Sequence, residues 1–359
     1  MPDSARVLIV DDSRIFRAAL ERSLEGEDGI TIVGSVHSGE KALEFIRATP
    51  PDVVTLDVEM PGMDGLQTLR EIERFDATRP ACARIGVIMV SAFTKRGADV
   101  TVQALRAGAF DFVTKPSSPD EKTSQAQMRQ QLACKIRLYM ASRPRSVPTA
   151  TVLGPAQGVR PPRDRPLRAV LIAASTGGPR ALETILPDLC RRIDLPILVV
   201  QHMPAQFTLS LAENFARICD GGVVEASDGE PILPKTIYIA PGGRHLLLRA
   251  DAGRLLAGLN EQPPENGCRP SADVLFRSAA TVLGGDAAAV VLTGMGADGT
   301  AGLRALKRTG GYIIAQDEAT SVVWGMPGSV VAAGLADEVV PLEKITAAVT
   351  AVVNVGRRP

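Results

Sequence analysis

The segment Val290–Gly302 has the sequence VVLTGMGADGTAG, and three features of it together predict the fold class of the protein. A short apolar run leads into a glycine-rich turn that holds one carboxylate, Asp298, and a helix-like segment follows. A buried strand, a tight turn and a helix in this order are typical of an α/β protein with parallel strands. Two hypotheses compete for the turn: it binds a dinucleotide, or it supplies the acid of a catalytic triad.

The dinucleotide hypothesis rests on Gly294, Gly296 and Gly299, which form the pattern G-x-G-x-x-G. Asp317 follows the next predicted strand, Tyr312–Gln316, near the position expected for an acid that binds ribose. However, Asp298 lies inside the pattern, where its charge would repel a pyrophosphate. We therefore keep a nicotinamide enzyme as the less favoured alternative.

Length and charge limit the remaining possibilities. A chain of 359 residues favours two domains, and 40 basic against 40 acidic residues give no overall field that would attract nucleic acid or a membrane surface. Five cysteines without a C-x-x-C pattern suggest reduced thiols. No apolar run approaches the ~18 residues of a membrane span. We expect a soluble, cytoplasmic protein without direct membrane insertion.

The first third of the chain alternates short apolar runs with helix-like segments, which predicts a parallel sheet covered by helices on both faces. Ser13 is predicted to cap the helix-like segment that follows, in which the apolar residues Ile15, Ala18, Ala19 and Leu24 recur at helical spacing. The clearest apolar runs are Arg6–Asp12, Asp52–Asp57, Gly86–Ser91 and Ala109–Lys115.

These strands end in polar residues: Asp11, Asp12, Asp57, Ser91 and Lys115. The carboxyl ends of parallel strands form the edge at which open α/β sheets bind ligands. Three carboxylates there would repel one another unless a hard cation such as Mg²⁺ lay among them. Asp57 could then attack a phosphoryl group whose oxygens Ser91 and Lys115 hold. Simple exposure of strand ends would explain one or two of these groups, but not five.

Residues 5–125 closely resemble the receiver domain of bacterial response regulators. The resemblance implies a flavodoxin-like, five-stranded parallel sheet in which Asp57 accepts phosphate from a chemotaxis histidine kinase. Asp11 and Asp12 would bind Mg²⁺ together with Asp57. Ser91, Phe112 and Lys115 would form the phosphate switch, and the Lys115–Pro116 bond resembles the cis peptide of that family.

Beyond Ser117 the strand pattern fades. Gln125–Met140 is predicted to form one more amphipathic helix, with Met128, Leu132, Ile136 and Tyr139 on one face. Arg143–Pro166 is rich in Pro, Gly and Arg without periodicity, which is typical of a flexible connector. We predict a receiver domain at 1–125, a linker at 126–166 and a catalytic domain at 167–359.

In the last part, the predicted strand Arg168–Ala174 ends in Ser175-Thr176-Gly177-Gly178-Pro179. A serine at such a turn projects beyond the sheet edge, where helix N–H groups could stabilise an oxyanion, although the same turn also suits a phosphate or a plain helix cap. The next strand, Pro196–Val200, leads to His202. His202 is preferred as a base over His245 because it directly follows a strand, and His37 is expected to be a surface residue.

Ser175, His202 and Asp298 would therefore meet at one sheet edge as nucleophile, base and orienting acid. Their order along the chain differs from the three familiar orders of serine hydrolases, so an ordinary α/β-hydrolase is excluded. From spacing alone, three unrelated polar loop residues would be an equally good interpretation.

Five segments are similar to the catalytic domain of the CheB family of chemotaxis protein-glutamate methylesterases: 174–179 (ASTGGP), 201–204 (QHMP), 238–243 (YIAPGG), 269–276 (RPSADVLF) and 292–299 (LTGMGADG). The resemblance covers about 167–352 and implies a doubly wound, mostly parallel α/β hydrolytic domain. It implies Ser175 as nucleophile, His202 as base and Asp298 as its partner. Met295 would donate its N–H to the oxyanion and Thr176 would support the site.

The resemblance further implies an esterase, activated by phosphorylation, that hydrolyses glutamate methyl esters on methyl-accepting chemoreceptors and releases methanol. It implies deamidation of receptor glutamines as well, no cofactor for the esterase reaction and a monomeric protein. Ala173 and Asn214 replace a glycine and an arginine expected from the family. A regulator with a DNA-binding output would need a helix-turn-helix and a basic face, and neither is visible in the sequence. A regulator that acts by binding alone stays open.

Overall fold

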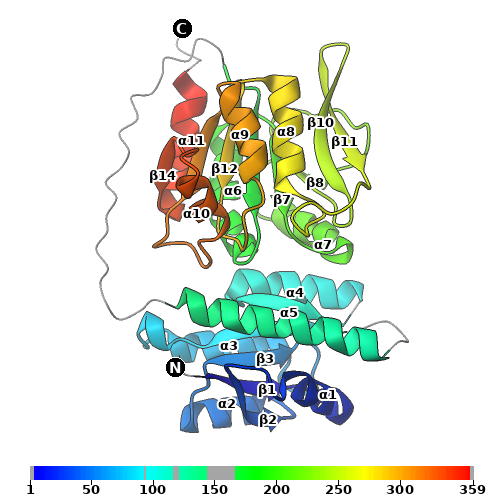
Figure 1. Cartoon of the computed structure of the whole chain (residues 1–359), viewed down its shortest axis with the longest axis vertical. Coiled ribbons are helices and arrows are strands. Elements are labelled where there is room, and N and C mark those ends of the chain that lie inside the picture. The colour runs from blue at the N-terminus through cyan, green and yellow to red at the C-terminus, as the bar shows by residue number, and fades with distance from the viewer. Residues whose placement is uncertain (1–3, 93, 116–120, 144–165, 356–359) are drawn as a thin grey trace. The chain divides into compact units, whose positions relative to one another are not determined.

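The computed structural model of the chain describes residues 4–92, 94–115, 121–143 and 166–355. It divides into two compact units, 1–150 and 151–359, which are drawn in Figure 1 and are described separately below. The predicted connector spans 143–166, and its residues 144–165 lie outside the described residues, as does the Lys115–Pro116 peptide bond.

The first unit contains a five-stranded sheet with the order β2-β1-β3-β4-β5, in which every neighbouring pair is parallel. This confirms the predicted fold of the receiver-like region. Its elements are β1 (Ala5–Val10), α1 (Arg14–Leu24), β2 (Ile30–Val36), α2 (Gly39–Ala48), β3 (Val53–Asp57), α3 (Gly65–Asp76), a 3-10 turn (Ala81–Ala83), β4 (Gly86–Ser91), α4 (Lys95–Ala107), β5 (Asp111–Thr114) and α5 (Glu121–Ser142).

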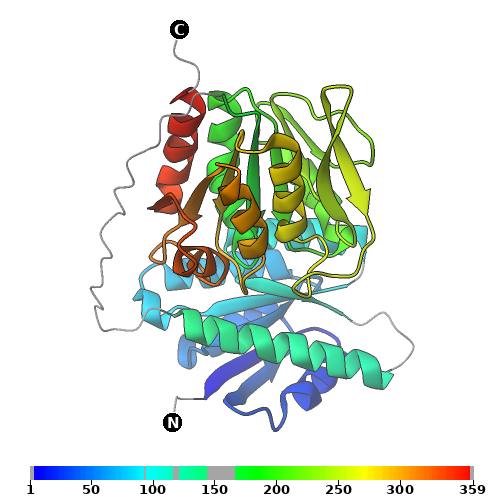
Figure 2. The same cartoon turned by 45° about the horizontal axis from the view of Figure 1, so that its top comes forward.

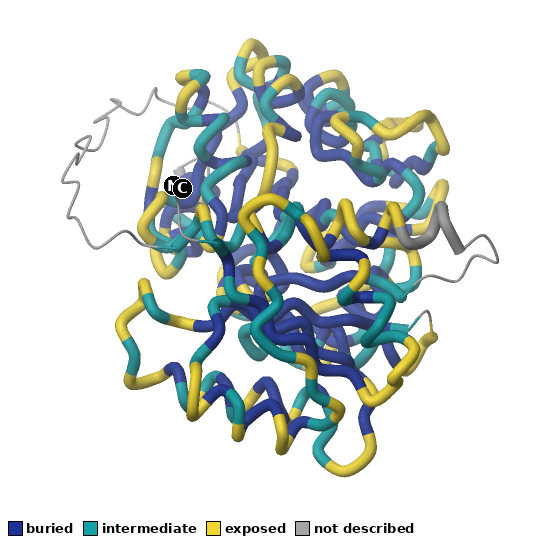
Figure 3. The backbone as a smooth tube through the Cα atoms, turned by 60° about the horizontal axis from the view of Figure 1, so that its bottom comes forward, coloured by how far each residue is buried: buried dark blue, intermediate teal, exposed yellow. Residues whose placement is uncertain are grey.

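Helices pack in two groups around this sheet. Helices α1 and α5 contact each other, while α3 contacts α2 and α4. Strands β3 and β4 are buried along their whole length. Figure 3 shows buried segments in dark blue in the interior and exposed segments in yellow at the surface. Residues on both faces of the central strands are therefore removed from water, which explains their continuous apolar runs.

Two predictions for this unit can be compared with the structure. Ser13 does cap α1, because its side chain accepts a hydrogen bond from the N–H of Phe16. Of the apolar residues at helical spacing, Leu24 is buried but the side chain of Ile15 is 83% exposed, and Leu20 is also buried. Because α1 begins at Arg14, Ile15 lies in its first turn.

Helix α5 confirms the predicted amphipathic segment. Met128, Leu132 and Ile136 are buried, and the Tyr139 ring packs edge-on against Phe110 with 5.0 Å between ring centroids. The helix contacts α1, β1 and β5, so it is part of the packing of the first unit.

The second unit contains a seven-stranded sheet with the order β14-β13-β12-β6-β7-β9-β8, in which every neighbouring pair is parallel. A separate antiparallel hairpin, β10 and β11, completes the mostly parallel α/β domain predicted from the sequence. The elements are β6 (Ala169–Ala174), α6 (Gly178–Arg192), β7 (Ile197–Gln201), α7 (Ala205–Ala216), β8 (Gly222–Glu225), β9 (Thr236–Ile239), β10 (His245–Asp251), β11 (Arg254–Asn260), α8 (Ala272–Leu283), β12 (Ala287–Val291), α9 (Thr300–Arg308), β13 (Tyr312–Gln316), α10 (Met326–Ala332), β14 (Glu338–Val340) and α11 (Leu342–Val355).

Helices cover both faces of this sheet, as Figure 2 shows. On one face, alternate residues of β6 (Ala169, Leu171 and Ala173) pack in a core with residues of α8 and α9. Helix α11 contacts α6 and β13, and α7 contacts β8 and β9. Because β6 is central and pairs with β7 and β12, the loops that follow these three strands meet at one edge of the sheet.

Within the described residues, no helix has both the length and the apolar character that crossing a membrane requires.

Candidate active site

Strand register places Ser175 beside His202. Ala174 of β6 pairs with Gln201 of β7, so the two residues that follow these partners leave the sheet together. The N–H of His202 donates to the carbonyl of Ala174 at 3.1 Å. The Gln201 side chain donates to the Ser175 carbonyl at 3.0 Å, which fixes the backbone of the turn.

The loop after β12 reaches the same edge. The N–H of Leu292 donates to Ala173, and the N–H of Ser175 donates to the carbonyl of Thr293 at 3.1 Å. Gly294 then passes so close to the serine that a β-carbon on Gly294 would lie 2.8 Å from the Ser175 Cβ. Glycine is thus required for this close approach. The next residue, Met295, is 46% exposed.

A later segment, 323–326, packs against this loop. The N–H of Gly294 donates to Val323, and Met326 donates to the Gly294 carbonyl at 2.8 Å. A β-carbon on Gly325 would lie 2.7 Å from the Gly294 oxygen. The sequence analysis did not single out this segment, because nothing in its composition indicates a function.

These contacts argue against the dinucleotide hypothesis. The chain's own residues 323–326 pack against the loop that would have to receive a pyrophosphate. Asp317, the proposed ribose ligand, instead accepts hydrogen bonds from the N–H and the hydroxyl of Thr320 at 3.0 and 2.6 Å.

Asp298 is a buried carboxylate with its own set of donors, and its Oδ2 lies 2.7 Å from His202 Nε2. It sits at the N-terminus of α8, where the Ala272 N–H donates to it at 2.7 Å and the Ser271 hydroxyl at 2.7 Å. Asn266 Nδ2 donates at 3.1 Å. A helix N-terminus favours a negative charge, so the structure holds Asp298 as an ionised, oriented partner of the histidine.

The charges of this pair reinforce each other. Burial acts to raise the pKa of Asp298, but the hydrogen bond and charge of His202, with the donors Ser271 and Ala272, outweigh it and hold that pKa well below its usual range. Burial acts to lower the pKa of His202, but hydrogen bonds with Asp298 and Cys268 raise it to about 9. The pair therefore favours an imidazolium beside a carboxylate.

The second nitrogen of the His202 ring faces a residue that the sequence analysis missed. Cys268 Sγ lies 3.6 Å from His202 Nδ1. Among the described residues, the Ser175 hydroxyl forms no hydrogen bond with His202. The structure thus brings Ser175, His202 and Asp298 to one sheet edge and joins His202 and Asp298 directly, while the Cys268 thiol contacts the other ring nitrogen of His202.

The other two histidines lie elsewhere. His37 is exposed, as predicted. His245, the competing candidate for the base, is fully buried, and its ring contacts the carbonyl of Pro263 and accepts from the N–H of Ser271 at 3.1 Å. It stabilises the start of α8 and does not reach the Ser175 edge through any of these contacts.

Two further residues noted in the sequence are buried. Ala173 is fully buried in β6, and Asn214 of α7 donates from its side chain to the carbonyl of Ser210 at 2.8 Å. The helix-internal bond and the burial of Asn214 place it inside the domain.

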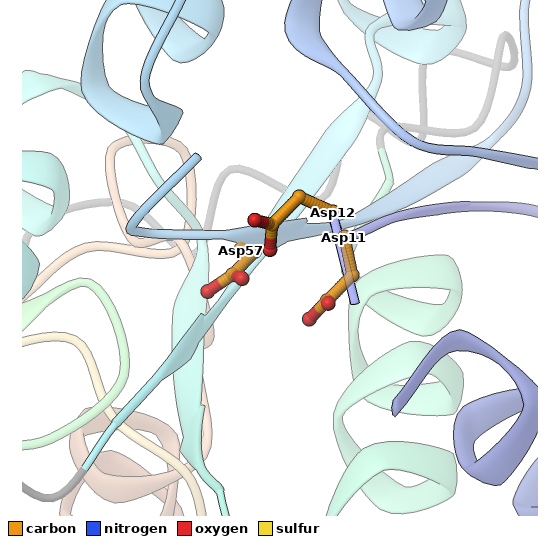
Figure 4. Close-up of side chains that lie close together, drawn as sticks. All are labelled: Asp11, Asp12 and Asp57. Atoms are coloured by element: carbon orange, nitrogen blue, oxygen red, sulfur yellow. The ribbon is translucent and has the colours of Figure 1, made fainter. Parts of the chain in front are cut away.

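In the first unit, the predicted acidic cluster is present. One ligand atom from each of Asp11, Asp12 and Asp57 lies within 4.8 Å of the others, and Figure 4 shows the three carboxyl groups together. Lys115 Nζ lies 2.7 Å from Asp57 Oδ2 and 2.8 Å from Asp11 Oδ2. Carboxylate oxygens are the ligands that Mg²⁺ prefers, and the exposure of Asp12 leaves the cluster open to solvent, so these residues fit such an ion.

Burial raises the pKa of Asp57 to about 6. The nearby Lys115 lowers this pKa but only partly offsets the effect of burial, and the negative charge of Asp11 raises it further. Burial acts to lower the pKa of Lys115, but its hydrogen bonds to Asp11 and Asp57 outweigh this and raise it. Ser91 is buried at the end of β4, where its hydroxyl donates to the Ala92 carbonyl at 3.3 Å. Phe112 is buried in β5, with Lys135 Nζ 5.9 Å from its ring centroid.

Comparisons with known proteins identify two domain families in the chain. The family model for the CheB methylesterase matches residues 170–349, and that for the response regulator receiver domain matches residues 7–127. A protein-glutamate methylesterase/protein-glutamine glutaminase of Azospirillum brasilense is 40% identical over 96% of this chain and 91% of its own length. One of Nocardioides sp. is 43% identical over 94% of this chain and 92% of its own length.

A solved structure resembles the second unit. The crystal structure of the Thermotoga maritima CheB methylesterase catalytic domain covers 52% of this chain and 99% of its own, with 44% identity and a TM-score of 0.51. Two family models in this order, and relatives that match nearly the whole length, show that the chain belongs to the CheB methylesterase family and carries a response regulator receiver domain ahead of the methylesterase domain.

Proposed function

We propose that this protein is a phosphorylation-activated protein-glutamate methylesterase that hydrolyses glutamate methyl esters on methyl-accepting chemoreceptors and releases methanol. The observation that carries the proposal is the bonded pair His202–Asp298 at the sheet edge where Ser175 follows β6. The names of the relatives support deamidation of receptor glutamines as a second activity. Both reactions proceed through the same acyl-enzyme.

In this mechanism, the Ser175 hydroxyl attacks the ester carbonyl and gives its proton to His202. Nε2 of the ring is bonded to Asp298, so Nδ1 is the nitrogen that receives the proton. Asp298 orients the ring and stabilises the imidazolium that forms. The protonated ring then gives the proton to the departing methoxide oxygen, so that methanol leaves and the acyl-enzyme remains. Water attacks the acyl carbonyl while His202 takes its proton, and the ring passes that proton to the Ser175 oxygen as the glutamate is released.

The developing oxyanion needs donors fixed before the reaction. We propose the N–H of Met295 as one of them, because Gly294 holds the start of this loop against Ser175. Thr176 supports the turn through its carbonyl, which accepts from the Thr293 hydroxyl at 3.0 Å. The contacts of the loop with 323–326 keep it in place during the reaction.

In the receiver domain, Asp57 is the proposed phosphoryl acceptor, with a chemotaxis histidine kinase as donor. Mg²⁺ held by Asp11, Asp12 and Asp57 would offset the charge of the incoming phosphoryl group. Lys115 lies close enough to Asp57 to neutralise a phosphoryl oxygen there. Ser91 and Phe112 complete the proposed switch.

We further propose that the protein works in the cytoplasm as a monomer, uses no cofactor for the esterase reaction and binds no nucleic acid. The functional division at 1–125, 126–166 and 167–359 also stays a prediction. Because α5 packs in the first unit, the connector proper would begin after that helix.

The direct test replaces Ser175 with alanine and measures methanol release from methylated receptor. The Ser175→Ala protein should lose at least about 10³-fold in kcat, since its nucleophile is absent. Ser227→Ala, which removes an exposed serine of the same domain, should keep the wild-type rate. Retained hydrolysis by Ser175→Ala would exclude Ser175 as nucleophile, and retained regulation without hydrolysis would favour a regulator that acts by binding.

A further inference from the structure

Cys268 reaches the active site through a tight turn. Glu265 and Cys268 exchange two backbone hydrogen bonds, of 3.0 and 2.9 Å. Between them, Asn266 and Gly267 have φ values of 53° and 74°. Two consecutive positive φ values define a type I′ turn, and Asn-Gly is the dipeptide that adopts it most readily. The turn therefore has a defined shape and presents Asn266 and Cys268 to the same site.

The turn is tied to the rest of the domain at three points. The Arg277 guanidinium of α8 forms a two-pronged ion pair with Glu265. Asn266 Nδ2 donates to Asp298 Oδ1 at 3.1 Å and to Asp273 Oδ2 at 2.8 Å. The Arg269 carbonyl, on the other side of Cys268, accepts from Gly243 at 3.0 Å. These contacts keep the sulfur of Cys268 against the ring of His202.

We propose that Cys268 is a positioning residue for His202, whose thiol contacts the base nitrogen Nδ1 and makes ester hydrolysis depend on that thiol remaining unmodified. This inference rests on the proposed function, in which His202 is the base. Since Asp298 engages Nε2, Nδ1 is the atom that Ser175 and Cys268 share. The thiol holds the imidazole ring in the orientation in which Nε2 bonds to Asp298. When the serine transfers its proton to Nδ1, the thiol gives up its contact with that nitrogen.

A group added to the sulfur would occupy the space in front of Nδ1. Methyl methanethiosulfonate provides such a group: the thiolate sulfur attacks the sulfenyl sulfur, a new S–S bond forms, and methanesulfinate leaves with the electron pair of the broken S–SO₂ bond. The proton of the thiol goes to solvent. Cys268 is half-buried and within reach of a small reagent, whereas Cys190 and Cys219 are buried.

The first experiment treats the full-length protein with this reagent and measures methanol release. The kcat of the wild-type protein should fall at least about 100-fold, the share of the rate that a general base supplies, and dithiothreitol should restore it. A Cys82→Ser/Cys134→Ser protein should be equally sensitive, because it retains Cys268. Cys268→Ser and Cys268→Ala should resist the reagent. If either of them is inactivated as strongly as the wild type, the proposal fails.

The second experiment compares the pH dependence of kcat in Cys268→Ala, Cys268→Ser and the wild type. The charged or titratable groups around the ring are Asp298 and Cys268 in direct contact, and Asp273, Glu265 and Arg277 beyond them. Because Cys268 helps to raise the pKa of His202, Cys268→Ala should move the acidic limb of the profile to lower pH. Cys268→Ser, which keeps a hydrogen-bonding group, should lie between the two.

These results separate this inference from the proposed function. The role of Cys268 alone would be overturned by the following results: Ser175→Ala loses activity, but both Cys268 variants are inactivated by the reagent like the wild type and keep the acidic limb of the wild-type pH profile. Full activity of Ser175→Ala together with loss in Cys268→Ser would instead overturn the serine mechanism. If Cys268→Ala fails to fold, as circular dichroism would show, the reagent test on Cys268→Ser decides the question.

Discussion

At the scale of single residues, several neighbours together fix both the charge and the orientation of the Asp298 carboxylate. Its two oxygens receive hydrogen bonds from His202, Asn266, Ser271 and Ala272. Buried charges are stable only when paired and hydrogen-bonded, and this carboxylate is both. The same bonds that stabilise the charge fix the direction in which it holds the imidazole.

The raised pKa of His202 predicts the pH dependence of hydrolysis. A general base must be deprotonated, so a pKa raised to about 9 requires a pH above neutral for full activity. Methanol release by the wild-type protein should therefore rise between about pH 7 and pH 9. Asp298→Asn removes the charge that raises this pKa, so the limb should move to lower pH while kcat falls about 10³- to 10⁴-fold. An unmoved limb would contradict the electrostatic coupling of the pair.

The buried Asp57 predicts an effect on stability. Its pKa in the folded protein, about 6, lies above the value of about 3.9 in an unfolded chain. Folding therefore favours the protonated form, and the ionised form weakens the fold as the pH rises from about 4 to 6 and stays costly above it. Asp57→Asn should raise the free energy of unfolding by about 1–3 kcal/mol at neutral pH and by little at about pH 4.

Chemical denaturation of the full-length protein in the presence of EDTA would measure this difference. Asp64→Asn provides a matched control, because Asp64 is a helix cap of the same domain outside the cluster. Its effect should be a small destabilisation, typical of a lost cap charge. A pH-independent gain for Asp57→Asn would show that burial does not set the pKa of this carboxyl.

At the scale of elements, the loops after β12 and β13 act together. The segment 323–326 contacts the glycine-rich turn at several backbone atoms, so the shape of one loop determines the shape of the other. Gly325 lies at the closest point, where a β-carbon would be 2.7 Å from the Gly294 oxygen and 2.8 Å from the Gly296 nitrogen. Backbone atoms cannot yield as a flexible side chain can.

Gly325→Ala should therefore displace the turn that carries Met295. We expect kcat to fall on the order of 100-fold, the typical effect of losing one oxyanion donor, and stability to fall by about 1–3 kcal/mol through overpacking. Gly222→Ala on the edge strand β8 is the control, since its added carbon meets only the end of the Thr236 side chain, at 3.3 Å. Equal kcat values for the two variants would exclude the loop contact as a determinant of activity.

The strands were predictable because their signal is local. Continuous apolar runs such as Gly86–Ser91 and Tyr312–Gln316 coincide with the observed strands, since a buried parallel strand needs apolar residues on both faces. The convergence of Ser175, His202 and Asp298 at one edge also followed from the rule for strand ends. The spacing of apolar residues does not by itself indicate which of them a helix buries: Ile15 and Leu24 were both noted at helical spacing, but Ile15 is exposed and Leu24 is buried.

The contacts of Cys268 and of residues 323–326 could not be predicted. Both depend on the path of a loop after it leaves the sheet, which no periodic pattern records. The Asn266–Gly267 dipeptide does signal a tight turn, but only the fold shows that this turn faces His202. Sequence patterns therefore indicated which strand ends carry chemistry, while the neighbours that tune that chemistry come from tertiary packing.

At the scale of the whole molecule, two domains with separate cores carry two different chemistries. Acetyl phosphate, a small phosphodonor, should increase methanol release by the wild-type protein when Mg²⁺ is present. EDTA should abolish the increase, and excess Mg²⁺ should restore it, because the carboxylates of the acidic cluster repel a phosphoryl group without a cation. The rate measured without phosphodonor should be the same with and without EDTA.

Asp57→Asn should not respond to acetyl phosphate, since its side chain cannot form an acyl phosphate. Glu59→Gln, an exposed change near the same strand end, should still respond. An undiminished response in Asp57→Asn would place phosphorylation elsewhere or exclude it as the activating event.

The strand order of the large sheet also has a consequence for how the enzyme is made. Strand β6 lies between β7, which follows it closely in the sequence, and β12, which the ribosome adds more than a hundred residues later. Domains emerge from the ribosome N-terminus first, so the serine and histidine appear long before the aspartate and the loop beside it. With the proposed triad, the nascent methylesterase domain would therefore stay inert until Asp298 has been synthesised.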